Sequence, residues 1–394
     1  MSGAWPRKKV SEIAKHSLGK MLDRSKNKGD LKPYLRNQNV RWFDFDLSDV
    51  SEMRFLPEEL AKYTVSKGDV VVCEGGYPGR AAIWDQDKPI YFQKALHRVR
   101  FSEPDRNKWF LYYLLSRDLD GTLKQHFNGA GIQHFTGEAL AQFELPVPPL
   151  AEQRRIVSIL DEAFEGIAAA KVNAEQNLCN VRELYQNHLQ SVFTQRGPGW
   201  AEKRLGELSR IKYGYTDSAS AQIVGPQFLR ITDLQPSGVD WDTVPYCSID
   251  KTDLPKYRLA DGDIVFARTG ATTGKSHLVT NPPEAVFASY LIRVQLRDKA
   301  VQPKFVNMFF QTRSYWDAIR AGVSGSAQGG FNATKLGDLV IPFPESPSDQ
   351  TSLVAKLDEL AADIKRLANL YERKLQALDA LKRSLLHQAF AGQL

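Results

Sequence analysis

The feature that most constrains the fold of this chain is an internal repeat. The segment "KYTVSKGDVVV" at 62–72 matches "KYRLADGDIVF" at 256–266, an offset of 194 residues, and "LPVP" at 145–148 matches "IPFP" at 341–344, an offset of 196. The matched segments agree in order, spacing and residue type, and the small drift in offset is what loop insertions cause. The chain is therefore a duplication, and the second half must build again whatever the first half folds into.

Each copy has two parts. The first part mixes short β-rich runs such as "DVVVC" and "DIVFA" with Gly/Pro punctuation and with helical stretches at 108–119 and 304–319. The second part is a long helix after a proline-rich segment, since proline ends a strand and fits the first turn of a helix. We therefore expect an α+β chain with a pseudo-two-fold repeat, in which two similar mixed α/β domains, the first and second heads, are separated by two long helices. The predicted boundaries are 1–149 for the first head, 150–196 for the central helix, 197–346 for the second head and 347–394 for the C-terminal helix.

Both long segments carry an apolar seam at heptad spacing, with one extra step of four residues at the equivalent positions Leu178 and Leu375. Seams that share this irregularity can face each other along a common length, and a single exposed seam would aggregate. We therefore predict an antiparallel coiled coil, with a helix folded back on its own head as the alternative. His188 also falls on the seam and is interpreted as a core or interface histidine. The seam residues are Ile156, Leu160, Ile167, Leu178, Leu353, Leu357, Leu360, Ile364, Leu367 and Leu375.

Composition limits the class of protein. Of the 394 residues, 42% are apolar and 25% charged, which is typical of a soluble globular chain. No apolar run approaches the ~20 residues that cross a bilayer, and the N-terminus does not look like a secretory signal. Cys73, Cys179 and Cys247 show no metal-like spacing and indicate three buried, reduced thiols in a cytoplasmic protein. The net charge is +6, and eleven basic residues against three acidic ones lie between Arg7 and Arg41. Such a run favours a polyanionic partner, with a solvated surface loop as the alternative.

A glycine-rich segment after an apolar run, "RTGATTGKS" at 268–276, raises the question of a nucleotide site. A P-loop needs four residues between its glycines, whereas Gly270 and Gly274 enclose three. The repeat places "CEGGYPGRA" at 73–81 opposite this segment, with its glycines and a cation, Arg80, but without a Lys-Ser pair. The copies share a strand, a tight Gly turn and a basic residue, which indicates phosphate contact. A P-loop NTPase is the less favoured alternative.

The sequence contains no constellation of catalytic or metal-binding residues. HExxH, Cys-x-x-Cys and the zinc-deaminase pattern are all missing. The segment "NPPE" at 281–284 is similar to the Asn/Asp-Pro-Pro-aromatic tetrapeptide of amino-methyltransferases, but glutamate stands in place of the stacking aromatic, and we interpret it as a turn. We expect no catalytic residue, no metal ligand and no cofactor in this chain.

The combination of motifs resembles the DNA-specificity subunit of type I restriction–modification systems. The resemblance covers essentially the whole chain. It is carried by the repeated Gly-Asp-apolar strand with its Gly turn at 68–80 and 262–275, by "ELPVPPLAEQRRIVSILD" at 144–161 and by the C-terminal "LKRSLLHQAFAGQL". The second copy departs from the pattern at the helix entry, where "PFPESPSDQTSLVAKLD" lacks the Arg154-Arg155 pair. Contacts of these two arginines therefore need not be two-fold related.

The resemblance implies that each head is a target-recognition domain for one half of a bipartite, asymmetric site on double-stranded DNA, and that the long helices set the gap between the halves. The helices would also dock two methyltransferase (modification) subunits, which would carry S-adenosylmethionine. Restriction subunits would add a motor and a nuclease that use ATP and Mg. The chain would itself be non-catalytic and cytoplasmic, in a prokaryote, with no membrane partner. The alternative is a coiled-coil protein-interaction scaffold without DNA specificity, which leaves the duplicated heads and the basic run unexplained.

Candidate DNA-binding residues are those whose side chains suit bases or phosphates, such as Arg for guanine and Asn or Gln for adenine. Arg80 and Lys275 are expected at phosphates, and Arg36 and Arg230 match in the repeat, which indicates a shared structural or phosphate role. The candidates in the first head are Arg36, Asn37, Gln38, Arg41, Tyr77, Arg80, Asn128, Gln133 and His134. Those in the second head are Tyr215, Arg230, Thr232, Arg268, Thr269, Thr272, Lys275, Ser276, Ser326 and Gln328.

Overall fold

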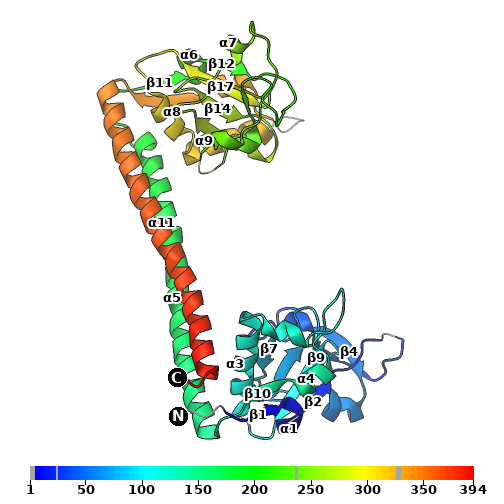
Figure 1. The fold of residues 1–394 in the computed structure, drawn as a ribbon. Coiled ribbons are helices and arrows are strands. Elements are labelled where there is room, and N and C mark those ends of the chain that lie inside the picture. Colours follow the sequence, from blue (N-terminus) through cyan, green and yellow to red (C-terminus); the bar gives the residue numbers. More distant parts are fainter. Residues whose placement is uncertain (1–4, 24, 236–237, 325–329) are drawn as a thin grey trace. The chain divides into compact units, whose positions relative to one another are not determined.

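The computed structural model of the chain describes residues 5–23, 25–235, 238–324 and 330–394. The chain divides into two compact units (Figure 1), one made of residues 1–175 and 372–394 and the other of residues 176–371. Each unit holds one head and a stretch of both long helices, α5 (Leu150–Thr194) and α11 (Pro347–Phe390). The predicted fold class, α+β with a duplicated head and two long helices, is confirmed.

The first head is built from short strands and helices. Its strands are β1 (Arg7–Lys9), β2 (Ala14–Leu18), β3 (Asp30–Leu35), β4 (Ser51–Phe55), β5 (Thr64–Val65), β6 (Val70–Cys73), β7 (Ala81–Ile83), β8 (Ile90–Phe92), β9 (Leu96–Phe101) and β10 (Glu144–Pro146). Its helices are α1 (Val10–Ile13), α2 (Leu60–Tyr63), α3 (Arg106–Leu119) and α4 (Gly137–Gln142), with the 3-10 turns η1 (Asn37–Asn39), η2 (Pro57–Glu59) and η3 (Thr122–His126). The strands pair in the orders β2-β9-β6-β7, β4-β3-β8-β5 and β1-β10.

The second head repeats this plan. Its strands are β11 (Trp200–Arg204), β12 (Ser209–Tyr213), β13 (Gln227–Leu229), β14 (Ile264–Ala267), β15 (Ser276–Leu278), β16 (Ala285–Phe287), β17 (Leu291–Leu296) and β18 (Val340–Pro344). Its helices are α6 (Leu205–Leu208), α7 (Leu254–Tyr257), α8 (Pro303–Phe309), α9 (Arg313–Ser324) and α10 (Ala333–Gly337), with the turns η4 (Ile231–Asp233), η5 (Trp241–Thr243) and η6 (Gly270–Thr272). The strands pair in the orders β12-β17-β14-β15, β13-β16 and β11-β18.

Strand pairing confirms the sequence repeat at the level of register. β12, β17, β14 and β15 stand where β2, β9, β6 and β7 stand in the first head, and every pair within these two matched sheets is antiparallel. Val70 pairs with Val99, and its equivalent Ile264 pairs with Val294. β13 runs parallel to β16 as β3 does to β8. Equivalent residues of the two heads therefore lie at equivalent places in one backbone frame.

The central strand of each head is buried on both faces, which explains its uninterrupted apolar sequence. In the second head, Ile264 and Phe266 join the core beneath α8, whereas Val265 and Ala267 point into a separate core on the other face of the sheet. Val70 to Cys73 alternate in the same way in the first head. These strands are the fixed platform from which the loops of each head emerge.

The Gly-Asp pair that precedes each central strand forms a tight turn. Gly68 and Gly262 have φ of 90° and 85°, a left-handed conformation that favours glycine. Each following aspartate is buried, and its carboxylate accepts a hydrogen bond from a backbone N–H three residues earlier, at 2.7 Å for Asp69 and 2.9 Å for Asp263. The repeated motif is therefore a structural turn that fixes the start of the platform strand.

One predicted helix of the second head is two helices. The sequence indicates a continuous helix over 304–319, but α8 ends at Phe309 and α9 begins at Arg313. The interruption is at the buried Thr312, whose hydroxyl donates to the carbonyl of Phe309 at 2.7 Å and accepts from the N–H of Tyr315 at 3.2 Å. A threonine whose hydroxyl accepts from the N–H of the third residue of the next helix acts as its N-cap. Helical periodicity alone did not reveal this break.

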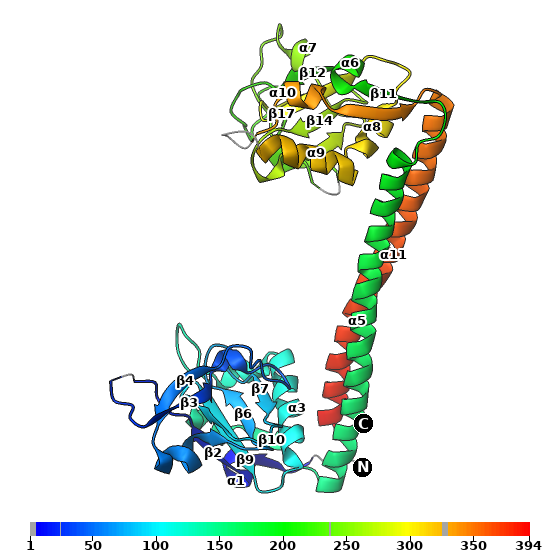
Figure 2. The same ribbon diagram turned by 180° about the vertical axis from the view of Figure 1, so that it is seen from behind.

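In each unit a stretch of α5 lies alongside a stretch of α11, and the two run antiparallel (Figures 1 and 2). In the first unit, Lys171 bonds Asp379 at 2.8 Å, and the ammonium of Lys382 lies 4.7 Å from the ring centre of Phe164, an earlier residue of α5. Contacts that move back along α5 as they move forward along α11 define the antiparallel direction. The predicted packing of the two helices is confirmed within each unit.

The ends of the long helices belong to the cores of the heads. Ile156 and Leu160 of α5 share one core with Leu386 of α11 and with α3. In the second unit, Leu189 and Phe193 are buried with α8, and the rings of Phe193 and Phe305 are 5.0 Å apart. His188, assigned to the seam from its spacing, is exposed, because α5 turns the next residue, Leu189, toward the second head. The assignment of His188 to the core is therefore wrong, and the interface alternative stays a prediction. Cys179 of the same helix, expected to be buried, is exposed as well, because it lies on the outer side of α5.

A buried histidine makes the first head sensitive to acid. His97 is fully buried, its Nε2 lies 2.9 Å from the carbonyl oxygen of Phe135, and its Nδ1 has no hydrogen-bond partner among the described residues. Burial lowers the pKa of His97 from 6.5 to about 4. The unfolded chain therefore binds a proton between these values that the folded chain does not, and stability falls as pH falls through this window.

We predict that acidification from pH 7 to pH 4 removes about 3 kcal/mol of stability through His97. Urea unfolding at both pH values measures this loss. His97→Ile, which installs the residue of the equivalent position Ile292, should reduce the pH dependence by that amount. His188→Gln changes an exposed histidine and should leave it unchanged. If His97→Ile and the parent chain lose stability equally on acidification, the prediction fails.

Candidate nucleic-acid interface

The Gly turns that follow β6 and β14 have the same hydrogen-bonded frame. In the first head, the N–H of Cys73 donates to the carbonyl of Arg80 at 2.8 Å, and the N–H of Gly79 donates to the carbonyl of Cys73 at 2.9 Å. In the second head, Ala267 takes the place of Cys73, Lys275 that of Arg80 and Gly274 that of Gly79, at 2.8 and 2.9 Å. Each loop is thus a closed turn at the end of the platform strand.

Both closing glycines are required by their surroundings. Gly79 and Gly274 have φ of 83° and 95°. A Cβ atom on Gly79 would lie 2.4 Å from Leu123, and one on Gly274 would lie 2.8 Å from Trp316. In "RTGATTGKS", Gly274 therefore serves turn geometry and close packing, and Gly270, with φ of 74° and open space around it, serves turn geometry.

The second-head loop is not built as a phosphate cradle. The backbone N–H groups of Thr273, Gly274 and Lys275 all donate to carbonyls of the same turn, at 2.9 to 3.1 Å. A P-loop instead turns such groups toward the nucleotide and leads into a helix, whereas this loop leads into strand β15. The structure thus argues against a P-loop NTPase.

The basic residue of each turn reaches the neighbouring 3-10 turn. Arg80 Nη2 donates to the carbonyl of Asn37 at 3.0 Å, and Lys275 Nζ donates to the carbonyl of Leu234. Each contact ties the Gly turn to η1 or η4, and it occupies one of the several N–H donors of the cation. The expected contact of Arg80 and Lys275 with DNA phosphates remains a prediction.

Arg36 and Arg230 hold the same turns from the other side. The backbone N–H of each arginine donates to the side chain three residues later, Asn39 at 2.9 Å and Asp233 at 2.8 Å. The guanidinium of Arg36 pairs with Asp49 at 2.9 Å and that of Arg230 with Asp233 at 2.8 Å. For Arg36 and Arg230 the sequence predicts a shared structural or phosphate-binding role, and these contacts support the structural one.

In the first head the other candidates surround the Gly turn. The amide of Asn37 donates to the carbonyl of Gly75 at 3.1 Å, and the imidazole of His134 lies close to Gly75. Asn128 and His134 pair as an antiparallel bridge, with the exposed Gln133 beside them. Three segments far apart in sequence, η1, 74–80 and 128–134, thus form one surface, which we call the first tip.

Charged partners fix the remaining candidates of the first head. Gln38 donates to the Asp49 carboxylate at 3.1 Å, and Arg41 pairs with Asp46 at 3.0 Å. Tyr77, which is exposed, donates its hydroxyl hydrogen to Asp118 at 3.0 Å and lies under the guanidinium of Arg80. These side chains are therefore oriented but still reach solvent.

The second tip is formed by η4 and the 268–276 loop. Arg268 donates from Nε to the carbonyl of Ser289 at 3.0 Å and lies over the ring of Tyr213. Thr269 and Thr272 lie on the turn itself, Ser276 begins β15, and Thr232 is exposed on η4. Tyr215 is placed apart from the turn, because its ring packs on Tyr257 of α7. Ser326 and Gln328 lie outside the described residues.

One residue of the first tip escaped the sequence analysis. Glu74 is the structural equivalent of Arg268, since the N–H of Phe135 donates to the carbonyl of Glu74 at 2.7 Å as that of Phe331 does to Arg268 at 2.9 Å. The carboxylate of Glu74 makes no hydrogen bond or ion pair with the part of the chain that the structure describes. Partial burial raises its pKa. The repeat offset of 194 residues already paired Glu74 with Arg268, and the opposite charges at this position were the signal.

Glu74 lines a hollow at the first tip. The hollow has a volume of about 620 Å³ and is also lined by Lys94, Asn128, His134 and Leu22. Two of these residues were candidates from sequence, and Lys94 and Glu74 add a charge of each sign. Within the described segments, no group of three or more His, Cys, Asp or Glu side chains is placed to hold a metal ion. The tips thus offer charge and hydrogen bonds to a ligand.

The seam residues differ in burial along the long helices. Ile156, Leu160, Ile167 and Leu357 are buried. The partly buried members are Leu178, Leu353, Leu360, Ile364 and Leu375. Leu367 is exposed, because two helices alone cannot cover both sides of their own seam. No described helix is long and apolar enough to span a membrane.

The chain was compared with known proteins. The family model for the type I restriction modification DNA specificity domain matches it twice, at residues 3–177 and 198–372. The EcoKI specificity subunit of Escherichia coli K12 is 22% identical, over 93% of this chain and 83% of its own length. The StySPI specificity subunit of Salmonella potsdam is also 22% identical, over 93% and 83%.

Solved structures share the fold. A chain from a study titled "Structural basis underlying complex assembly and conformational transition of the type I R-M system" matches with a TM-score of 0.80 and 18% identity, over 100% of this chain and 99% of its own. The HsdS subunit of Thermoanaerobacter tengcongensis matches with a TM-score of 0.65 and 20% identity, over 100% and 98%. With two copies of the family domain across most of its length, the chain belongs to the type I restriction–modification DNA specificity family.

Proposed function

We propose that this chain selects the DNA site of a type I restriction–modification complex. Each tip reads one half of a bipartite site on double-stranded DNA, and the long helices set the gap between the halves. The chain itself carries no chemistry in this proposal. Two modification subunits bring S-adenosylmethionine, and restriction subunits bring ATP and Mg, in the cytoplasm of a prokaryote.

The observation that carries the proposal is the pair of matched tips with different side chains. The same closed turn ends the same platform strand in both heads, yet Glu74 stands in one tip where Arg268 stands in the other. Arginine pairs with the O6 and N7 acceptors of guanine, and glutamate accepts from the N4 amino group of cytosine. One frame with opposite charges suits two half-sites of different sequence.

The long helices also offer a surface to a partner. Val172 and Leu381 of the first unit are exposed, as are Leu184 and Leu370 of the second. Exposed aliphatic side chains on a helix pair with covered seams favour a protein partner. Each unit presents such residues, which fits one modification subunit per unit.

The first test concerns base reading. Arg268→Gln should lower affinity for the cognate duplex by about 1–3 kcal/mol, roughly 5- to 150-fold, and relax selectivity at one base pair of one half-site. Glu74→Gln should relax selectivity at one base pair of the other half-site. Selection of bound duplexes from a randomised pool, with the full chain and its modification subunit, measures both effects.

Lys299→Gln removes a charge from an exposed position of the second head outside the tip and serves as the control. It should leave the selected sequence unchanged. Selectivity that stays intact in both tip variants would contradict base reading by these residues. No selectivity in the parent complex would leave the protein-interaction scaffold as the better description.

The second test concerns the gap. One heptad inserted into α5 after Glu175, with a matching heptad in α11 after Tyr371, lengthens the helix pair by about 10.5 Å. At 3.4 Å per base pair, the selected gap should grow by about three base pairs while both half-sites stay the same. The same pool selection measures this change.

A heptad inserted into α5 alone is the control for the second test. It shifts one seam against the other, so it should impair assembly rather than give a new, defined gap. A matched insertion that alters a half-site, or that leaves the gap unchanged in a complex that still binds, would contradict the ruler.

A further inference from the structure

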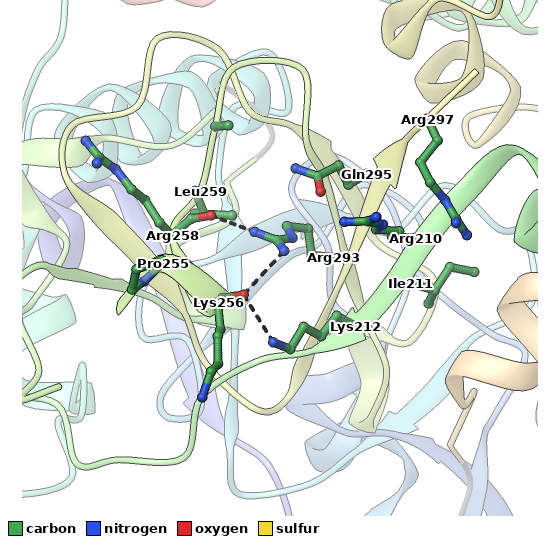
Figure 3. A pocket seen from close by; sticks show the side chains of 11 residues that line it. Arg210, Ile211, Lys212, Pro255, Lys256, Arg258, Leu259, Arg293, Gln295 and Arg297 are labelled. Atoms are coloured by element: carbon green, nitrogen blue, oxygen red, sulfur yellow. Dashed lines mark hydrogen bonds between the residues drawn. The ribbon is translucent and has the colours of Figure 1, made fainter. Parts of the chain in front are cut away.

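The second head contains a basic groove away from the Gly turn. The groove has a volume of about 750 Å³ and lies between the β12–β17 sheet face and the segment 255–260 (Figure 3). Strand residues alternate between faces, and Arg293 and Gln295 of β17 line it together with Arg210, Ile211 and Lys212 of β12. Its basic residues are Arg210, Lys212, Lys256, Arg258, Arg293 and Arg297, and none of the eleven described lining residues is acidic.

Two of these cations hold the groove together. Arg293 donates to the carbonyl of Arg258 at 2.6 Å, and Lys212 donates to the carbonyl of Lys256 at 3.3 Å, as Figure 3 shows. These bonds fix the wall of 255–260 against the sheet. The groove is therefore a formed surface, and its shape does not depend on a ligand.

The positive charge is only partly compensated. Asp253 pairs with Lys256 at 2.7 Å, and Asp263 lies 3.7 Å from Arg293. The side chains of Arg210 and Arg258, in contrast, form no hydrogen bond or ion pair with any described residue. Burial and the nearby charges of Arg293 and Lys256 lower the pKa of Lys212. The groove thus holds more positive charge than the protein neutralises.

The fold does not account for all of this charge. In the first head the positions equivalent to Lys212, Arg258 and Arg297 are Ser17, Thr64 and Ser102, on the same backbone frame. The first head also neutralises Arg100, which Asp69 holds through two bonds of 2.6 Å. The other three positions are basic in both heads, as Lys15, Lys62 and Arg98 of the first. Since the first head folds without cations at the remaining three, packing does not explain Lys212, Arg258 and Arg297 in the second.

The chemistry of the lining points to phosphates. Four of the six cations are arginines, whose guanidinium groups bind phosphate through two parallel N–H donors. Single strands are held by stacking of bases on aromatic rings, and none of the described lining residues is aromatic. The groove can therefore hold a charged backbone without reading bases.

We propose that this groove binds backbone phosphates of duplex DNA independently of sequence, outside the half-site that the second tip reads. The proposal rests on DNA being the ligand of the chain, as proposed above. In this proposal the groove of the second head adds to the affinity for DNA but not to the selectivity for a base sequence, because phosphate contacts position a protein without specifying sequence.

The test is the salt dependence of binding to a duplex of random sequence, with the full chain and its modification subunit. The double variant Arg210→Gln/Arg258→Gln removes two cations that hold nothing in place. The slope of log Kobs against log salt should become shallower by about 1.8, since each phosphate contact contributes about 0.9. The loss of affinity should be equal on cognate and random duplexes.

The matched control is Lys299→Gln/Arg313→Gln, which removes two exposed charges of the same head outside the groove. It should leave the slope near that of the parent chain. Equal slopes in both double variants overturn the proposal, because the effect would then be one of net charge. A loss confined to the cognate duplex also overturns it, and so does weakened binding of the modification subunit with duplex binding intact, which would make the groove a protein-docking surface. Because random duplex needs no site selection, this readout stays valid if the base-reading proposal fails.

Discussion

The rigid junction between each head and the long helices is the constraint on which the rest depends. At both junctions a fully buried glutamine near the start of the helix, Gln153 or Gln350, donates its amide to a proline carbonyl at 2.7 Å. A lysine of the head then bonds an aspartate two turns further on, Asp161 at 2.6 Å and Asp358 at 2.5 Å. A polar group buried at a junction must keep its partner, because losing it leaves an unmade hydrogen bond. A helix can transmit a distance only if the head cannot pivot on it, and these paired bonds oppose such pivoting.

On this frame the two copies differ in the charge that they expose. The turn geometry, the Gly-Asp start of the platform strand and the tie from cation to 3-10 turn are the same in both heads. The first tip has Glu74 where the second tip has Arg268, and β2 has Ser17 where β12 has Lys212. Backbone hydrogen bonds and a few matched side-chain contacts keep the frame, so the remaining side chains need not match. Exposed side chains on a shared frame can therefore change without loss of the fold, as two readers of different half-sites require.

The repeat made most of the fold predictable. Equivalent segments had to form equivalent elements, so the two similar heads, the long helices and the equivalence of the two Gly turns followed from sequence, whereas the order of the strands did not. The predictions that failed concerned residues whose structure depends on tertiary contacts. The N-cap at Thr312 divides a segment whose periodicity predicts one continuous helix. Leu189 is buried instead of His188 because the end of α5 packs against the second head. The internal bond of Lys275 to Leu234 joins residues that are distant in sequence, and no local pattern reveals it.

Several basic side chains of the tips bind other groups of the protein, and this affects which residues can contribute to DNA affinity and which to sequence selectivity. Arg80 and Lys275 each hold a carbonyl of the neighbouring turn, and Arg36 and Arg230 are ion-paired, so the tips commit much of their positive charge to their own structure. A tip held in this way is preorganised, and base contacts gain from side chains whose positions are fixed before binding. Phosphate contacts need no such precision, because the attraction is long-ranged and independent of sequence. Uncompensated charge is therefore better placed outside a tip than in it. The second head fits that division, because its groove keeps Arg210 and Arg258 without partners among the described residues.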